Sequence, residues 1–321
     1  MSTRRQTKPQ HKRGENNWQK QLAILDGAYA ESTIRAYRAD IQCFVNWCSS
    51  NGKRPFPANP KLIARFISED ADLSSTSTIK RRLAAISKIH RLLKLTNPIQ
   101  DEEVKLALRR AFRGKFARPK QALGLTAKMR DKLIEACSDG SMTAKRDRAL
   151  ISVGYDTLSR RSELSAICLE DIIFSDRGGS KVIIRRAKND QYGQGRVAYI
   201  SNKSTNFLKA WIKAAKIDSG PLFRSIKHNK IHTKAIHPHS INRIIKKAAE
   251  KAGMSQQEIS NLSGHSMRVG TAQDMMIAGL DILPIMAAGG WKTTNVVARY
   301  IENADLSVSL RRRPPSTDAY L

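Results

Sequence analysis

A histidine and an arginine three residues apart are the first side chains in this sequence whose types and spacing could do chemistry. His265 and Arg268 lie within the segment GHSMR, at the start of an expected helix, and their spacing places both on one helical face. The N–H groups at the N-terminus of a helix favour an anion at the same position. The pair could therefore bind a phosphate group. An ordinary surface histidine and arginine fit the spacing as well, because chance matches to H-x-x-R are common.

Four further side chains could contribute to such a site. In the segment YDTLSRRSEL, Arg160 precedes Glu163 by about one helical turn, where the carboxylate could hold the guanidinium in a bidentate pair. Lys188 ends an expected strand and faces a turn, from which a flexible ammonium can reach across a groove. Tyr300 falls on the apolar stripe of an expected helix. Taken singly, these residues are also explained by an exposed ion pair, a solvated strand-end charge and a core tyrosine.

The charge balance of the chain indicates a polyanionic partner. The 321 residues include 57 Lys and Arg against 28 Asp and Glu, for a formal net charge of +29. Solubility needs a net charge of only about 2–8 in magnitude, and repulsion among so many like charges opposes compaction. Nucleic acid is the polyanion that we expect. A hydrophobic fraction of 40% is enough to form a core, so the sequence does not indicate disorder along the whole chain.

The sequence argues against several other classes of protein. It has no run of about 18 apolar residues, as a transmembrane helix requires, and its basic N-terminus lacks the apolar segment of a secretory signal. The four cysteines form no C-x-x-C pair, which indicates reduced thiols in a cytoplasmic protein. The histidines within 228–239 have no cysteine or carboxylate among them, so we expect a loop that faces an anion and no metal site.

The hydrophobic pattern predicts a mainly α protein with two domains and one small antiparallel sheet. The sheet is expected from the strand-like segments 181–188 and 195–201, which a polar turn joins, whereas the rest of that domain is expected to be helical. The predicted segments are a basic arm (1–17), an all-helical N-terminal domain (18–112), a basic linker (113–125), a mostly helical C-terminal domain (126–303) and a helix or tail (304–321).

Taken together and in this order, the motifs resemble the tyrosine recombinase family, and within it the Cre recombinase branch. The resemblance covers about residues 29–303 and is strongest over 264–301, which contains H-x-x-R, the GGW of that branch, and Tyr300. Four shorter stretches match as well: STIRAYRADIQCFVNWC, FPANP, PKQAL and YDTLSRRSELSAICLEDI. Because separate motifs occur in the right order through both domains and the linker, chance is a poor explanation.

The resemblance implies DNA strand cleavage by transesterification. Tyr300 would attack the scissile phosphodiester, forming a 3′-phosphotyrosyl link and releasing a 5′-hydroxyl. Arg160 and Arg268 would neutralise the nonbridging oxygens in the transition state. His265 would bind the phosphate or accept the tyrosine proton, and Lys188 would protonate the leaving oxygen.

Two supporting residues and the lack of a cofactor also follow from the resemblance. Trp291 would donate its indole N–H to a phosphate oxygen, and Glu163 would support Arg160 and His265. Many family members have histidine in place of Trp291, whereas Cre-like enzymes have tryptophan. Arg161 leaves open which of two adjacent arginines faces the phosphate, although the spacing to Glu163 favours Arg160. Neither a metal, another cofactor nor ATP would be needed.

For DNA binding, the resemblance implies a C-shaped clamp around a duplex. Basic side chains opposite the apolar stripes of two N-terminal helices, about 32–48 and 77–93, would lie at the major groove, and others on the helix of about 240–252 would reach base edges and phosphates. These side chains are Arg35, Arg38, Arg81, Arg82, His239, Asn242, Arg243, Lys246 and Lys247. Phosphate contacts without base preference explain them equally well.

The expected assembly is a homotetramer on two double-stranded DNA sites with inverted-repeat half-sites, in which the segment after Tyr300 docks on a neighbouring subunit. Two alternatives remain: a catalytically silent DNA-binding protein of the same fold, and a type IB topoisomerase-like enzyme or hairpin telomere resolvase. The presence of every catalytic residue type argues against the first. The two-domain length and the GGW motif argue against the second.

Overall fold

The computed structural model describes residues 17–113, 115, 121–185, 195–302 and 304. The chain divides into two compact units, Met1–Pro119 and Lys120–Leu321. Residues 1–16 of the predicted basic arm, residues 114 and 116–120 of the predicted linker, residues 186–194, which include Lys188, and residues 305–321 of the predicted tail lie outside the described residues.

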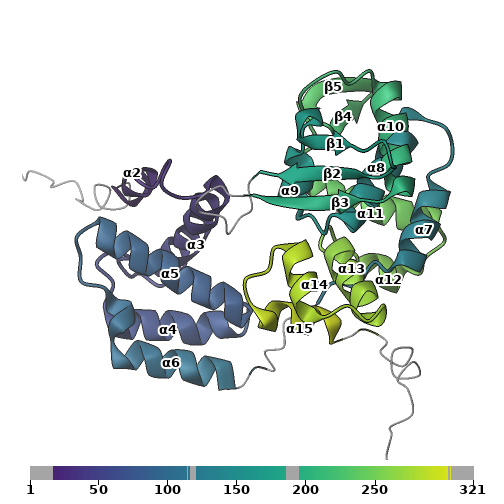
Figure 1. The fold of residues 1–321 in the computed structure, drawn as a ribbon. Coiled ribbons are helices and arrows are strands. Elements are labelled where there is room, and N and C mark those ends of the chain that lie inside the picture. Colours follow the sequence, from purple (N-terminus) through teal and green to yellow (C-terminus); the bar gives the residue numbers. More distant parts are fainter. Residues whose placement is uncertain (1–16, 114, 116–120, 186–194, 303, 305–321) are drawn as a thin grey trace, which may run out of the picture. The chain divides into compact units, whose positions relative to one another are not determined.

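The described part of the first unit is built from helices (Figure 1). They are α2 (Asn17–Ala23), α3 (Glu31–Ser50), α4 (Pro60–Ala71), α5 (Thr76–Leu92), the short 3₁₀-helix η1 (Pro98–Gln100) and α6 (Glu102–Arg113). Asn59 and Ser75, which precede α4 and α5, each accept a hydrogen bond from a backbone N–H in the first helical turn, as N-cap side chains do. Helix α3 corresponds to the helix predicted over about 32–48, and it begins at Glu31 with Ala30 as the N-cap residue.

The apolar stripes of these helices form two cores in the first unit. Phe44 of α3 is fully buried and packs edge-on against Phe66 of α4, with ring centroids 5.1 Å apart. The second core includes Trp18 of α2 and Ile89 of α5, both almost fully buried. Burial on one face of each helix follows the helical period of apolar residues in the sequence.

The second unit combines helices with two small antiparallel sheets (Figure 1). Its helices are α7 (Ala127–Ala136), α8 (Met142–Asp156), α9 (Arg161–Ala166), η2 (Leu169–Asp171), α10 (Asn202–Ala215), α11 (Pro238–Lys251), α12 (Gln256–Asn261), α13 (Ser266–Ile277), α14 (Ile282–Gly289) and α15 (Thr294–Ile301). The first sheet has the order β1–β2–β3, with β1 (Ile172–Phe174), β2 (Ser180–Ile184) and β3 (Arg196–Ile200). The second is the hairpin of β4 (Arg224–Lys227) and β5 (Lys230–Ala235).

The predicted fold class, a mainly α protein with a small antiparallel sheet, is confirmed. The β4–β5 hairpin was not predicted, because a histidine-rich loop was expected at this position. His228 and Asn229 form its turn with positive φ angles of 46° and 62°. Neither strand carries the alternation of apolar and polar residues that identifies a half-buried strand. The hairpin therefore left no periodic signal in the sequence.

Residues 121–125, predicted to belong to the linker, are fastened to the second unit. The N–H groups of Leu123 and Leu125 donate to the carbonyls of Asn261 and Ser266, at 3.0 and 2.8 Å. Gly270 of α13 lies so close that an added Cβ would be 1.9 Å from the Leu125 carbonyl oxygen. Only glycine permits this approach, which brings the backbone of α13 into direct contact with the backbone of residues 121–125.

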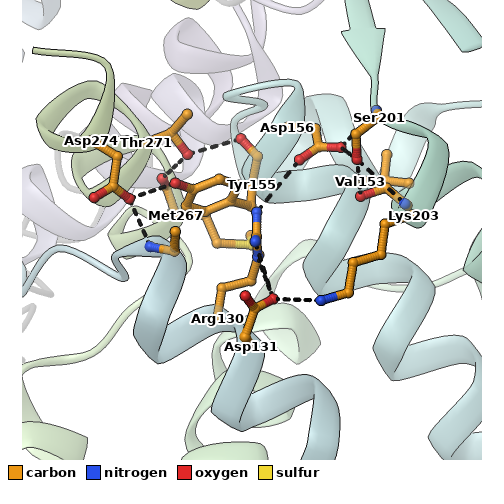
Figure 2. Close-up of polar contacts among 12 residues, drawn as sticks. Arg130, Asp131, Val153, Tyr155, Asp156, Ser201, Lys203, Met267, Thr271 and Asp274 are labelled. Atoms are coloured by element: carbon orange, nitrogen blue, oxygen red, sulfur yellow. Dashed lines mark hydrogen bonds and ion pairs between the residues drawn. The ribbon is translucent and has the colours of Figure 1, made fainter. Parts of the chain in front are cut away.

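A polar network fixes α13 to α7 and α8 (Figure 2). The Tyr155 hydroxyl of α8 donates to Asp274 of α13 at 2.5 Å, and the N–H of Ala127 donates to the same carboxylate at 2.7 Å. The guanidinium of Arg130 lies 4.4 Å from the centre of the Tyr155 ring. Burial and the neighbouring Asp274 carboxylate both raise the pKa of Tyr155, so its hydroxyl remains a donor. By fixing the C-terminal half of α13, the network also positions the N-terminus of that helix, at His265.

Three general expectations concern the molecule as a whole. The four cysteines, at positions 43, 48, 137 and 168, are free, as the sequence indicated. Across the part of the chain that the structure describes, no helix is both long and apolar enough to pass through a bilayer. The same residues contain no group of three or more His, Cys, Asp or Glu side chains arranged to hold a metal ion.

Candidate active site

The N-terminus of α13 presents the first two side chains of the site. His265 is the N-cap residue of α13, and Arg268 lies in its first turn. The turn before the helix is held by side chains, since Ser263 Oγ accepts from the His265 N–H at 3.1 Å and Asn242 Oδ1 accepts from the Gly264 N–H at 2.5 Å. The start of α13 is therefore fixed both by its own preceding turn and by α11, which carries Asn242.

Tyr300 of α15 lies directly against His265. Its hydroxyl forms a hydrogen bond with Nε2 of His265, and the two ring centroids are 5.2 Å apart. Trp291, which follows α14, also packs edge-on against Tyr300, with centroids 5.5 Å apart. The predicted nucleophile, the predicted base and the tryptophan thus form one aromatic cluster, although they come from three separate segments.

Arg268 lies beneath this cluster and is fully buried, with 0% of its surface exposed. Its guanidinium donates to the carbonyl of Leu158 and, at 2.9 Å, to that of Gly289. It also lies 4.6 Å from the centre of the Trp291 ring. Burial and the charge of Arg160 lower the pKa of Arg268 to about 10, which leaves it positively charged at neutral pH.

Arg160 and Glu163 form the ion pair that their spacing predicted. Arg160 Nη1 donates to Glu163 Oε1 at 2.5 Å, and the Arg160 backbone N–H donates to Oε2 at 3.0 Å. Burial opposes ionisation of Glu163, but these bonds outweigh it and hold its pKa below the ordinary value. Arg161 points elsewhere, because its aliphatic carbons pack over Gly264. Of the two adjacent arginines, Arg160 is therefore the one that is fixed beside Glu163.

Burial, together with the nearby arginine charges, sets the protonation of the cluster. Burial, followed by the charges of Arg268, Arg160 and Arg161, lowers the pKa of His265 to about 4. The imidazole is therefore neutral near pH 7 and can accept a proton. Burial raises the pKa of Tyr300, although the arginines and a hydrogen bond from Trp291 act in the opposite direction. The neutral imidazole can accept a hydrogen bond from the Tyr300 hydroxyl, whereas its lowered pKa makes it a weak base until a bound anion offsets the arginine charges.

Comparison with known proteins identifies the family. Residues 124–306 match the model of the Phage integrase family, and residues 16–97 match that of the phage integrase N-terminal SAM-like domain. The chain belongs to the phage integrase family. The resemblance to the tyrosine recombinases, Cre included, is thereby confirmed, and the chain is an enzyme of the tyrosine recombinase type.

Two relatives match this recombinase over most of its length. The integrase/recombinase XerD homolog of Selenomonas ruminantium is 30% identical, over 88% of this chain and 84% of that protein. Recombinase Cre of Escherichia phage P1 is 28% identical, over 87% of this chain and 86% of that protein.

Solved structures share the fold of the recombinase. The XerH site-specific recombinase, bound to a palindromic difH substrate after cleavage, matches with a TM-score of 0.66 and 15% identity, over 87% of this chain and 78% of that one. The Tn1549 transposon integrase in complex with transposon right end DNA matches with a TM-score of 0.64 and 15% identity, over 92% and 96% of the two chains.

The structure also contains three polar side chains at the site that the sequence did not indicate. Gln273 of α13 and Gln121 both donate to the backbone carbonyl of Tyr300, at 3.0 and 3.3 Å. Arg196, the first residue of β3, forms an ion pair with Glu163 at 3.5 Å. Gln121 and Gln273 lie in stretches that resemble the family, but both act on a backbone carbonyl, and the sequence does not show which side chain a carbonyl binds. Lys188 lies outside the described residues.

The predicted DNA-contacting side chains of the first unit differ in exposure. Arg38 is exposed, and Arg35 is exposed in a pair with Glu31. Arg81 is about half exposed and binds Asp40 through two hydrogen bonds. The expectation of an exposed Arg82 is wrong: its side chain is only 17% exposed and is bound to the buried carboxylate of Asp70. Buried carboxylates require such a partner, which draws Arg82 inward.

On α11, the predicted contacts separate into two groups. His239, Arg243 and Lys247 are exposed. Asn242 is partly buried and its Oδ1 already holds Gly264, whereas Lys246 donates to the Ser260 carbonyl at 3.3 Å. The oxygen of Asn242 is thus committed inside the protein, and the three exposed side chains are the ones free to approach a ligand without rearrangement.

Proposed function

We propose that this recombinase cuts and rejoins DNA strands at specific sites through a 3′-phosphotyrosyl intermediate on Tyr300. The observation that carries the proposal is the hydrogen bond between Tyr300 and a neutral His265, close to the buried Arg268 and the partly buried Arg160. A tyrosine hydroxyl is a weak nucleophile, so it needs an adjacent proton acceptor. Fixed cations nearby supply the charge that a phosphoryl transition state requires.

In the proposed step, Tyr300 Oη forms a bond to the scissile phosphorus while the bond from phosphorus to the 5′-oxygen breaks. His265 accepts the tyrosine proton, and the leaving 5′-oxygen takes up a proton from Lys188, which we assign from the family resemblance. The product is a 3′-phosphotyrosine and a free 5′-hydroxyl. Because the phosphodiester energy is retained in the protein–DNA bond, attack by a 5′-hydroxyl reverses the step and needs no cofactor.

The remaining residues of the cluster stabilise charge. Arg160, oriented by Glu163, would donate to the nonbridging oxygens. Arg268 adds a fixed charge from beneath and holds Trp291, whose indole N–H would donate to the phosphate or to Tyr300. This division follows from burial, since Arg160 is 20% exposed at the side chain whereas Arg268 is enclosed.

We further propose that the substrate is duplex DNA with inverted-repeat half-sites and that four copies act on two sites in the cytoplasm, where the free thiols stay reduced. Support comes from proteins of the same fold: XerH is bound to a palindromic substrate, and lambda integrase forms a tetramer on a Holliday junction. The net charge of +29 is consistent with a polyanion of this size. DNA affinity should accordingly fall steeply as salt increases.

A covalent-trapping experiment tests the proposal. Duplexes selected by binding from a random pool supply a target site, which is then nicked near the scissile position so that the cleaved end diffuses away. The native chain should form an adduct that survives denaturation, whereas Tyr300→Phe should bind equally and form none. Tight binding by the native chain without an adduct would contradict the recombinase proposal and favour the silent DNA-binding alternative. Recombined linear products would exclude a topoisomerase.

A further inference from the structure

Arg196 is a buried cation at the site for which the reaction above assigns no role. It begins β3, and its side chain is only 11% exposed. The guanidinium donates to the backbone carbonyls of Thr157 and Ala288, both at 2.8 Å, and pairs with Glu163 at 3.5 Å. A buried arginine is costly unless it is hydrogen-bonded and paired. Arg196 meets most of that requirement through Nη1 and Nη2, which join three segments of the active site, while its buried Nε has no hydrogen-bond partner.

The carbonyls bound by Arg196 are next in sequence to those bound by Arg268. Arg268 donates to Leu158 and Gly289, the residues that follow the two partners of Arg196. The two arginines therefore lie as a pair across the same two segments. These segments are the C-terminal ends of α8 and α14, where the last carbonyls have no partner within their helix and carry the negative end of the helix dipole.

Glu163 connects this arrangement to the phosphate-binding side chain. One of its oxygens accepts from the Arg160 guanidinium, and the other accepts from the Arg160 backbone and faces Arg196. The two arginines thus approach one carboxylate from two sides. Burial lowers the pKa of Arg196 while Glu163 raises it, which shows how closely the two charges interact. On the other side, Gly290 leaves room for Arg196, since an added Cβ would lie 3.1 Å from its Cδ.

We propose that Arg196 is a positioning residue for strand cleavage. It caps the ends of α8 and α14 beside Arg268 and holds Glu163 against Arg160, so that the groups facing the scissile phosphate keep their geometry. It does not act on the leaving oxygen. This inference rests on the proposed function, because positioning has meaning only for an enzyme that cleaves. Its expected effect is large, since a displacement of about 1 Å in a reacting group can cost about a hundredfold in rate.

The test compares Arg196→Met and Arg196→Lys with Arg185→Met, using single-turnover adduct formation at saturating protein on the selected nicked duplex. Arg185 is a suitable control because it directly follows β2, which pairs with β3, and it pairs with Asp171 while 67% of its side chain is exposed. Both Arg196 variants should cleave about 10–100-fold more slowly, and Arg185→Met should stay within about twofold of the native rate. Lysine should not rescue, because one ammonium cannot reach three acceptors in the planar geometry of a guanidinium.

A second substrate separates positioning from acid catalysis. Sulfur in place of the bridging 5′-oxygen leaves without protonation, because a thiol has a pKa of about 8.5. It should restore cleavage to Lys188→Ala but leave the Arg196 variants slow. Rescue of Arg196→Met by sulfur would overturn the proposal, as would native rates in both folded variants. Failure of both variants to fold, judged by circular dichroism, would also overturn it by assigning Arg196 to general stability. If the native chain itself forms no adduct, the proposed function fails instead.

Discussion

Each unit of the recombinase buries carboxylates beside arginines, but the two clusters have different charge balances. In the first unit, the carboxylates of Asp40 and Asp70, on α3 and α4, face Arg81 and Arg82 of α5. Two negative charges thus meet two positive charges. Such a cluster is neutral within itself and has no need of an outside anion.

In the second unit, a single carboxylate serves three arginines. Glu163 pairs with Arg160 and Arg196. Arg268 lies close enough to Arg160 that the charge of Arg160 lowers the pKa of Arg268. His265 adds no charge at neutral pH, since its pKa is lowered to about 4. Among the described residues of this cluster, the positive charges therefore exceed the negative charge by two. A phosphate group would supply the missing negative charge, so the charge balance, more than the residue types, distinguishes a binding site from a structural ion pair.

The largest effect is expected from breaking the unbalanced cluster. Arg160→Gln removes a cation whose charge is directed at the reacting phosphate. We expect adduct formation to slow about 10²–10³-fold, as when one transition-state donor is lost, with little change in melting temperature. Quenched single-turnover assays and thermal melts measure the two quantities. A rate within a few-fold of native would show that Arg160 is only a structural partner of Glu163.

Breaking the balanced cluster of the first unit should lower stability and leave the cleavage rate unchanged. Asp70→Asn leaves the mostly buried Arg82 without its main partner, which should lower the free energy of unfolding by about 3 kcal/mol. Urea denaturation measures that loss. The rate of adduct formation per folded molecule should not change. If the rate fell while stability held, the first-unit cluster would belong to the catalytic machinery and the contrast would be lost.

The surplus of positive charge also predicts a dependence on pH. The pKa of His265 is lowered from its unfolded value of 6.5 to about 4, so the folded protein binds fewer protons between these values. Its contribution to stability is present above pH 6.5 and is lost as the pH falls toward 4, by about 2 kcal/mol at pH 5. Urea midpoints at pH 7 and pH 5 should differ less for His265→Gln than for the native chain. Equal differences would mean that burial and the arginine charges do not hold His265 neutral.

The smallest effect should come from the glutamine that holds the nucleophile by its backbone. Gln273→Leu removes the 3.0 Å hydrogen bond to the Tyr300 carbonyl. Losing one such bond costs about 1 kcal/mol, or about fivefold in rate. The expected change is in the rate of adduct formation and not in DNA affinity, which a binding titration checks. Weaker binding at an unchanged rate would place Gln273 at the DNA surface.

The sequence was most informative where a short motif fixes local geometry. The pairing of Arg160 with Glu163 followed from helical spacing, and the proximity of His265 to Arg268 followed in the same way. That these two segments meet Tyr300 could be inferred only from resemblance, because the contact depends on how α13 and α15 pack.

Other features could not be predicted because their partners lie far away in the chain or are backbone atoms. Arg82 turns inward because Asp70, on another helix, is buried. Arg196 binds the carbonyls of Thr157 and Ala288, which any residue provides equally. The β4–β5 hairpin lacked alternation, so composition alone suggested a loop.

The backbone contact between Gly270 and Leu125 has a practical consequence for protein engineering. The stretch from Gln121 to Leu125 reaches the Tyr300 carbonyl at one end and the α13 backbone at the other. An isolated catalytic fragment should therefore start at or before residue 120, even though the first helix of that unit begins at Ala127. A fragment trimmed to Thr126 would keep every catalytic side chain but lose residues 121–125, which contact α13 and the backbone of Tyr300 on α15. Fusions and inserted tags belong upstream of this stretch.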